Sequence, residues 1–77
     1  MIEFSLTTEQ KRQSLQALLS NLEMEIYNLI LILGQDPDTY DQSQIAGFSD
    51  REAPSTEEML FTRYTRYNLL KEKILNL

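Results

Sequence analysis

The sequence predicts an all-α fold: an antiparallel helical hairpin with a long ordered loop between its helices and a short extended arm at its N-terminus. Residues 7–33 and residues 55–77 both repeat apolar side chains with the period of a helix. Each stretch also opens with a sequence typical of a capping box. The 77 residues form a single domain, and a chain this short has a marginal core. We therefore expect two hairpins to assemble into a dimeric four-helix bundle.

Residues 1–6 form the predicted arm. Ile2, Phe4 and Leu6 alternate with polar residues, which is the period of a strand. No second clear strand follows in the sequence. We expect the arm either to lie on the helices of its own chain or to pair with the arm of another subunit.

The first helix is predicted over residues 7–33. Thr7 is its expected N-cap, with Gln10 as the capping-box partner and Gly34 as the residue that ends the helix. A continuous periodic stripe favours this helix over the alternative, a buried strand formed by the apolar run 26–33. The stripe contains Leu15, Leu18, Leu19, Leu22, Ile26, Leu29, Ile30 and Leu33.

A second, weaker stripe lies on the opposite face of the same helix. Ala17, Met24 and Leu31 recur every seven residues, and Tyr27 lies beside them. A helix that is apolar on two sides must contact more than one neighbour. We expect this stripe to be covered either by the loop of its own chain or by a partner.

The second helix is predicted over residues 55–77, with Ser55 as its N-cap and Glu58 as the capping-box partner. Acidic residues near its start and basic residues near its end suit the helix dipole. Its apolar stripe contains Leu60, Tyr64, Tyr67, Leu70 and Ile74.

The connection, residues 34–54, is far longer than the about 2 to 8 residues that two packed antiparallel helices need. It also carries apolar side chains that a simple linker does not need, namely Tyr40, Ile45 and Phe48. We therefore expect it to fold back on the helices. Asp36 could cap a short helix within it that starts at Pro37 and ends before Gly47.

The composition excludes several kinds of chemistry. The chain has no cysteine and no histidine, so disulfides, the usual zinc sites and the commonest catalytic bases are missing. It has only two glycines and no glycine-rich phosphate loop. We therefore expect a protein that is not an enzyme and that needs no cofactor.

The N-terminal residues do not resemble a signal peptide, and the longest apolar run is too short to span a membrane. The net charge of −5 favours solubility and disfavours broad binding to nucleic acids. We expect a soluble, cytoplasmic protein without a membrane partner.

The stretch Arg-Tyr-Thr-Arg-Tyr in the second helix raises the alternative of an RNA-binding hairpin. Arg63, Arg66 and Lys73 would supply its contacts. The helical period instead directs Tyr64 and Tyr67 into the apolar stripe. Nucleic-acid binding is therefore the less favoured hypothesis.

The loop raises a further alternative, a metal or ligand site. Asp36, Asp38 and Asp41 lie within six residues, and carboxylate oxygens bind Ca²⁺. The spacing fails for an EF-hand, because Asp41 and Gly47 occupy the positions that need glycine and glutamate. Turn and cap formation by these aspartates is the favoured interpretation.

The favoured function is a small noncatalytic protein–protein interaction or regulatory module that self-associates through its helices as a homodimer or higher oligomer. The predicted oligomer interface contains Leu22, Ile26, Leu29, Leu33, Leu60, Tyr64, Tyr67 and Ile74. The loop is predicted to face an unidentified protein partner, because loops on rigid scaffolds commonly carry function. Its candidate contact residues are Asp36, Asp38, Tyr40, Asp41 and Phe48.

Overall fold

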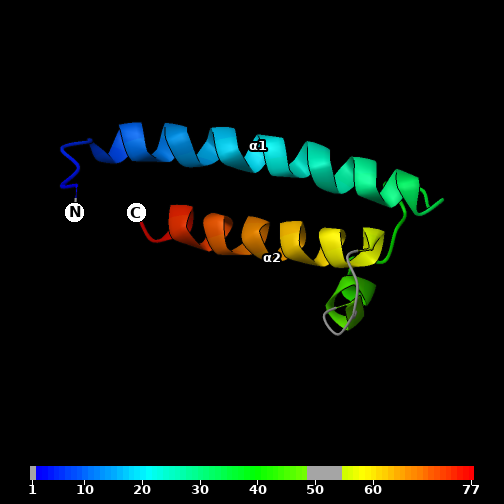
Figure 1. Cartoon of the computed structure of the whole chain (residues 1–77). Coiled ribbons are helices and arrows are strands. Elements are labelled where there is room, and N and C mark those ends of the chain that lie inside the picture. Colours follow the sequence, from blue (N-terminus) through cyan, green and yellow to red (C-terminus); the bar gives the residue numbers. More distant parts are fainter. Residues whose placement is uncertain (1, 49–54) are drawn as a thin grey trace.

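The structure, a computed structural model, describes residues 2–48 and 55–77, and every regular element within these ranges is a helix (Figure 1). The order is α1 (Thr8–Ile32), the 3-10 helix η1 (Gln42–Phe48) and α2 (Thr56–Leu75). α1 and α2 pack side by side and antiparallel, and η1 packs against α2 (Figure 1). The all-α class and the packed pair of long helices are therefore confirmed. The dimeric bundle involves a second chain and stays a prediction.

The start of α1 is fixed by a capping box. The Gln10 N–H donates to Thr7 Oγ1 at 3.1 Å, and the Thr7 N–H donates to Gln10 Oε1 at 2.9 Å. These bonds satisfy two of the backbone N–H groups that the first turn of a helix leaves without partners. The predicted box is confirmed, and the helix begins one residue after its cap.

The end of α1 has the hydrogen bonds of a Schellman motif. The Gln35 N–H donates to the Ile30 carbonyl at 3.2 Å, and the Gly34 N–H donates to the Leu31 carbonyl at 2.9 Å. The motif needs a left-handed residue just after the helix, and Gly34 has a φ of 80°. Glycine adopts this conformation without the steric penalty of a Cβ atom, so α1 ends where the sequence predicted.

Gly34→Ala is expected to lower the free energy of unfolding by about 1 kcal/mol, because a residue with a Cβ is strained in the left-handed region. The added Cβ would meet no atom within 4 Å, so the loss should come from the backbone alone. Gly47→Ala is the matched control, since Gly47 also has open space but no positive φ, and it should not destabilise the protein. Urea denaturation measures both variants. Equal losses would contradict the strain at Gly34.

α2 begins after Ser55, whose Oγ accepts a hydrogen bond from the Glu58 N–H at 3.2 Å. Among the described residues, only this half of the predicted capping box forms. The second half, a bond from the Ser55 N–H to the Glu58 carboxylate, is not seen in the described part of the chain, and Glu58 Oε2 is buried without a hydrogen-bond partner. Glutamates in the first turn and Lys73 in the last turn agree with the helix dipole.

The core lies at the end of the hairpin where the loop connects the helices. Its buried cluster contains Ile26, Leu29, Ile30, Ile45 and Leu60. Ile45 comes from η1, and Tyr40 and Phe48 pack against the cluster from either side of it in the sequence. The expectation that the loop folds back on the helices is therefore confirmed.

The short helix in the loop starts later than the sequence predicted. η1 begins at Gln42, directly after Asp41, and it contains Gly47. The predicted start at Pro37 with Asp36 as cap is wrong. Asp36 and Asp41 offer the same local cap chemistry. A start after Asp41 is favoured because it lets η1 bury Ile45 in the core.

The opposite end of the hairpin is open. Leu22 is the buried residue of α1 nearest to its N-terminus. Beyond it, Leu18 of α1 and Leu77 after α2 are 48% and 41% exposed. η1 packs at the other end, so among the described residues no third helix covers these leucines. The Cα atoms span 43 × 28 × 17 Å, a flat shape that leaves most side chains near a surface.

The described part of the arm forms no strand. Phe4 and Leu6 lie at the open end, where they line a groove of about 360 Å³ together with Leu15 and Leu77. Of the two expected arrangements, the structure shows the arm beside the helices of its own chain. Pairing with the arm of another subunit stays a prediction.

Candidate functional site

Most residues of the predicted oligomer interface are used inside the chain. Four of them are buried, namely Leu22, Ile26, Leu29 and Leu60. Three more pack against the core cluster, namely Leu33, Tyr64 and Tyr67. The eighth, Ile74, is half-buried toward the open end. The physical reason is the loop, because it adds Ile45 to a core that two helices alone could not enclose. A contact of these residues with a second chain stays a prediction.

Two polar contacts join α1 to α2. The Tyr67 hydroxyl donates to Glu23 Oε1 at 3.0 Å, and Arg63 Nε donates to Glu25 Oε2 at 3.2 Å. Burial, and then the hydrogen bond to Glu23, raise the pKa of the Tyr67 hydroxyl above its ordinary value. Both glutamates therefore border the apolar contact between the helices.

A cleft of about 420 Å³ lies on the Glu23 side of this contact and is lined by Tyr27, Tyr64, Tyr67 and Lys71, among others. The Glu23 carboxylate is bonded to Tyr67, and Lys71 Nζ lies 5.9 Å from the centre of the same ring. The carboxylate and the cation of the cleft therefore both interact with one tyrosine. The charges of Glu23 and Lys71 are opposite, so the lining of the cleft has little net charge with which to bind a small ligand.

The loop aspartates are exposed, and two of them shape the backbone. Asp36 Oδ1 accepts a hydrogen bond from the Asp38 N–H at 3.0 Å. Asp41 Oδ1 accepts from the Ser43 hydroxyl at 2.6 Å and from the Ser43 N–H at 3.1 Å, and these bonds lower the pKa of Asp41. In the described part of the chain, no three acidic side chains form a group that could hold a metal ion. The aspartates as contacts for a protein partner stay a prediction.

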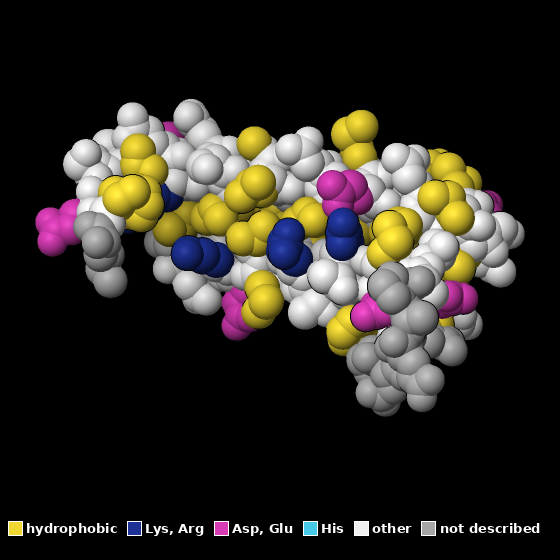
Figure 2. All heavy atoms as spheres, in the orientation of Figure 1, with side chains coloured by type: hydrophobic (Ala, Val, Ile, Leu, Met, Phe, Trp, Pro, Cys, Tyr) yellow, Lys and Arg dark blue, Asp and Glu magenta, His cyan; other side chains and the backbone are white. Residues whose placement is uncertain are grey.

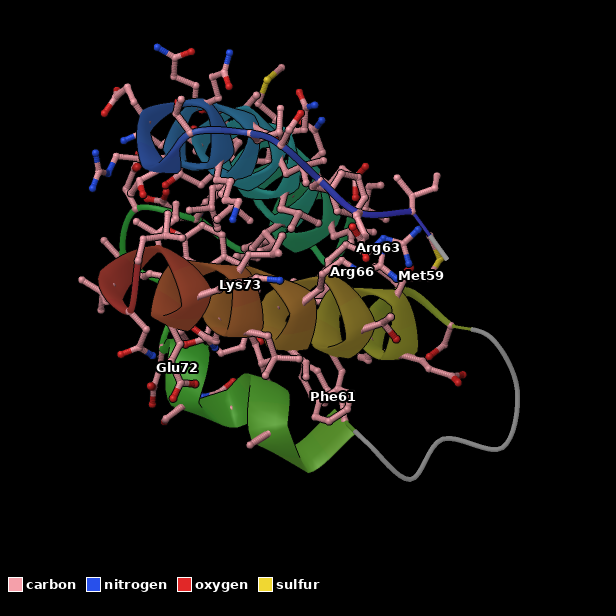
Figure 3. All side chains as sticks on the ribbon, turned by 90° about the vertical axis from the view of Figure 1, so that its left-hand side faces the viewer. Met59, Phe61, Arg63, Arg66, Glu72 and Lys73 are labelled. Carbon is pink, nitrogen blue, oxygen red and sulfur yellow. The ribbon has the colours of Figure 1, made fainter. Side chains whose placement is uncertain are left out.

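One flank of α2 is basic. Figure 3 shows Arg63, Arg66 and Lys73 on this flank, whereas Phe61 and Glu72 lie on the other. Arg63 is paired with a glutamate of α1, so its charge is partly neutralised. The basic flank agrees with the placement of the cations that the RNA alternative used, but the apolar side chains that line the groove beside Lys73 are mainly aliphatic.

An apolar strip runs between α1 and α2 on the same side, and basic side chains lie along its border (Figure 2). At the open end the strip widens into the groove described above. We call this the open-end groove; it is lined by Phe4, Leu6, Lys11, Ser14, Leu15, Lys73 and Leu77. Lys11 comes from α1 and Lys73 from α2, so cations border the groove from both helices. The sequence could not reveal this pairing, because it depends on the antiparallel arrangement of distant segments.

The second stripe of α1 is a separate surface. We call Ala17, Met24, Tyr27 and Leu31 the outer stripe; all four are exposed, and Met24 is 66% exposed. The backbone of η1 lies beside α2, and its Ile45 reaches the inner face of α1, so the described part of the loop leaves the outer stripe exposed. A partner chain as the cover of this stripe stays a prediction.

Comparisons with family models, with curated proteins and with solved structures found no match to this chain. None of the helices in the described ranges combines the length and the apolar character needed to cross a membrane.

Proposed function

We propose that the protein is a small noncatalytic protein–protein interaction module that forms a homodimer through the outer stripe of α1. The observation that supports this most directly is the exposure of apolar side chains at seven-residue intervals on the outer face of a long helix. This interval is the repeat by which two helices pack along a common seam. The dimer would then contain four long helices, as the sequence predicted, but with a different seam.

A two-fold symmetric pairing suits this stripe. In a symmetric dimer the same patch contacts itself, so residues on either side of the axis face each other. With antiparallel α1 helices and an axis at Met24, Ala17 of one chain faces Leu31 of the other, because both lie seven residues from the axis. A small side chain then opposes a large one at each end, which favours close packing. The eight residues predicted as the interface remain free to stabilise each monomer.

The double variant Met24→Glu, Leu31→Glu is expected to be monomeric under conditions in which the wild-type protein is a dimer. Two charges in each stripe would face the charges of the second copy and would lose water on association. Because both side chains are exposed within one chain, the folded monomer should persist. Size-exclusion chromatography with light scattering across a dilution series measures the mass, and circular dichroism checks the fold.

The matched control is Leu69→Glu, Leu75→Glu, which adds the same charge to exposed leucines of α2, 62% and 77% exposed. It should leave the dimer intact. A wild-type protein that is monomeric at every concentration would refute the homodimer. Dissociation by the control alone would place the contact on α2.

A further inference from the structure

We propose that the open-end groove and the basic flank of α2 form a docking site for an acidic amphipathic helix of another protein. This inference goes beyond the proposed homodimer, because it concerns a different face of the hairpin. Either proposal can fail while the other stands.

The floor of the site is apolar and unfilled. Leu15 and Leu77 line the groove together with Phe4 and Leu6 of the arm. Phe4 is 72% exposed, so the arm supplies a large apolar surface without burying it. The groove continues into the apolar strip between the helices, as Figure 2 shows. An apolar stripe on a partner would remove this surface from water, which is favourable.

The border of the site is basic in a chain whose net charge is −5. Lys11 borders the groove from α1 and Lys73 from α2, and Arg66 extends the row along α2 (Figure 3). Within the described residues none of these three cations forms an ion pair, whereas Arg63 is paired with Glu25. A partner with carboxylates beside its apolar stripe would therefore meet unpaired cations on both sides. Such complementarity gives specificity and speeds association.

A helix is the occupant that best matches this arrangement. The site is an elongated strip bordered by charges, and an amphipathic helix presents an apolar stripe with charged flanks in the same pattern. RNA fits less well, because the floor is mainly aliphatic and single-stranded bases stack on aromatic or planar groups. A second copy of this chain also fits less well. The glutamates beside its outer stripe, Glu23 and Glu25, already bond to Tyr67 and Arg63 of their own chain.

The test uses the full chain and a fluorescently labelled helical peptide with one leucine stripe flanked by glutamates. A second peptide has lysines in place of the glutamates. Fluorescence anisotropy should show saturable binding of the glutamate peptide and at least about tenfold weaker binding of the lysine peptide. Absence of saturable binding, or equal binding of the two peptides, overturns the proposal.

Arg66→Glu, Lys73→Glu should weaken binding of the glutamate peptide by at least about tenfold. The matched control Arg12→Glu, Lys71→Glu changes the net charge equally but lies outside the groove lining, and its effect should stay below about threefold. Equal losses in both variants overturn the proposal in favour of a general charge effect. The monomeric Met24→Glu, Leu31→Glu variant should bind the peptide as the wild type does, which separates this site from the dimer.

Two competition experiments decide between classes of partner. Single-stranded RNA and vesicles containing an anionic lipid are each added to the preformed complex with the glutamate peptide. Failure of both to displace the peptide supports the proposal. If either displaces it at lower concentration than unlabelled peptide, and if it binds through Arg66 and Lys73, the site recognises phosphate and the proposal is overturned.

Discussion

Ile45→Asp is expected to be largely unfolded, although Ile45 lies in the connection between the two long helices. Its side chain is 0% exposed and belongs to the core cluster. Placing an unpaired carboxylate there costs several kcal/mol. A domain of this length has a total stability of about 4–12 kcal/mol, from about 0.05–0.15 kcal/mol per residue. The single substitution therefore removes a large part of the stability, and far-UV circular dichroism should show the loss of helix.

Ala46→Asp is the matched control for this prediction. Ala46 is the next residue of η1 and is exposed, so the same charge remains in water. The control should keep its helix content and unfold near the wild-type urea concentration. If Ile45→Asp unfolds at the same concentration as Ala46→Asp, the loop does not form part of the core.

The long helices were predictable because their signals are local. The period of apolar residues locates a helix whatever it packs against, and the Thr7 cap and Gly34 act through bonds to residues a few positions away. The partial cap at Ser55 shows the limit of such signals. The sequence places a glutamate in register for a capping box, but the direction of its side chain depends on the surrounding packing.

The loop was predictable in part. Its apolar residues indicated burial, since a linker in water gains nothing from Ile45 or Phe48. The predicted start of its short helix was wrong because two aspartates offer equivalent caps, and only the position of the core distinguishes them. The choice between Asp36 and Asp41 is therefore a property of the whole fold.

The interaction surfaces were the least predictable part. An apolar stripe shows which face of a helix is buried but not whether its own chain or another chain covers it. Eight residues were therefore assigned to an oligomer although seven of them contribute to or pack around the monomer's buried interior. The open-end groove needs Lys11 and Lys73 at the same end of the hairpin, which only the antiparallel packing brings about.

Leu60→Ala is expected to lower the free energy of unfolding by about 2–5 kcal/mol. Leu60 is 0% exposed and lies in the core cluster, so the substitution leaves a cavity that the neighbours fill only partly. Leu69→Ala, on the same helix at a position that is 62% exposed, should cost less than about 0.5 kcal/mol. Urea denaturation measures both values. Similar losses at the two positions would contradict the packing of α2.

The concentration dependence of the Leu60→Ala effect tests where this leucine acts. Stability that comes from contacts between chains falls on dilution, whereas stability that comes from contacts within one chain does not. In the Met24→Glu, Leu31→Glu background, which removes the proposed dimer contact, the loss caused by Leu60→Ala should be the same at every protein concentration. A loss that varies with concentration would return Leu60 to an interface between copies. A constant loss assigns it to the core of the single hairpin, and the outer stripe then remains the surface proposed for contact between two hairpins.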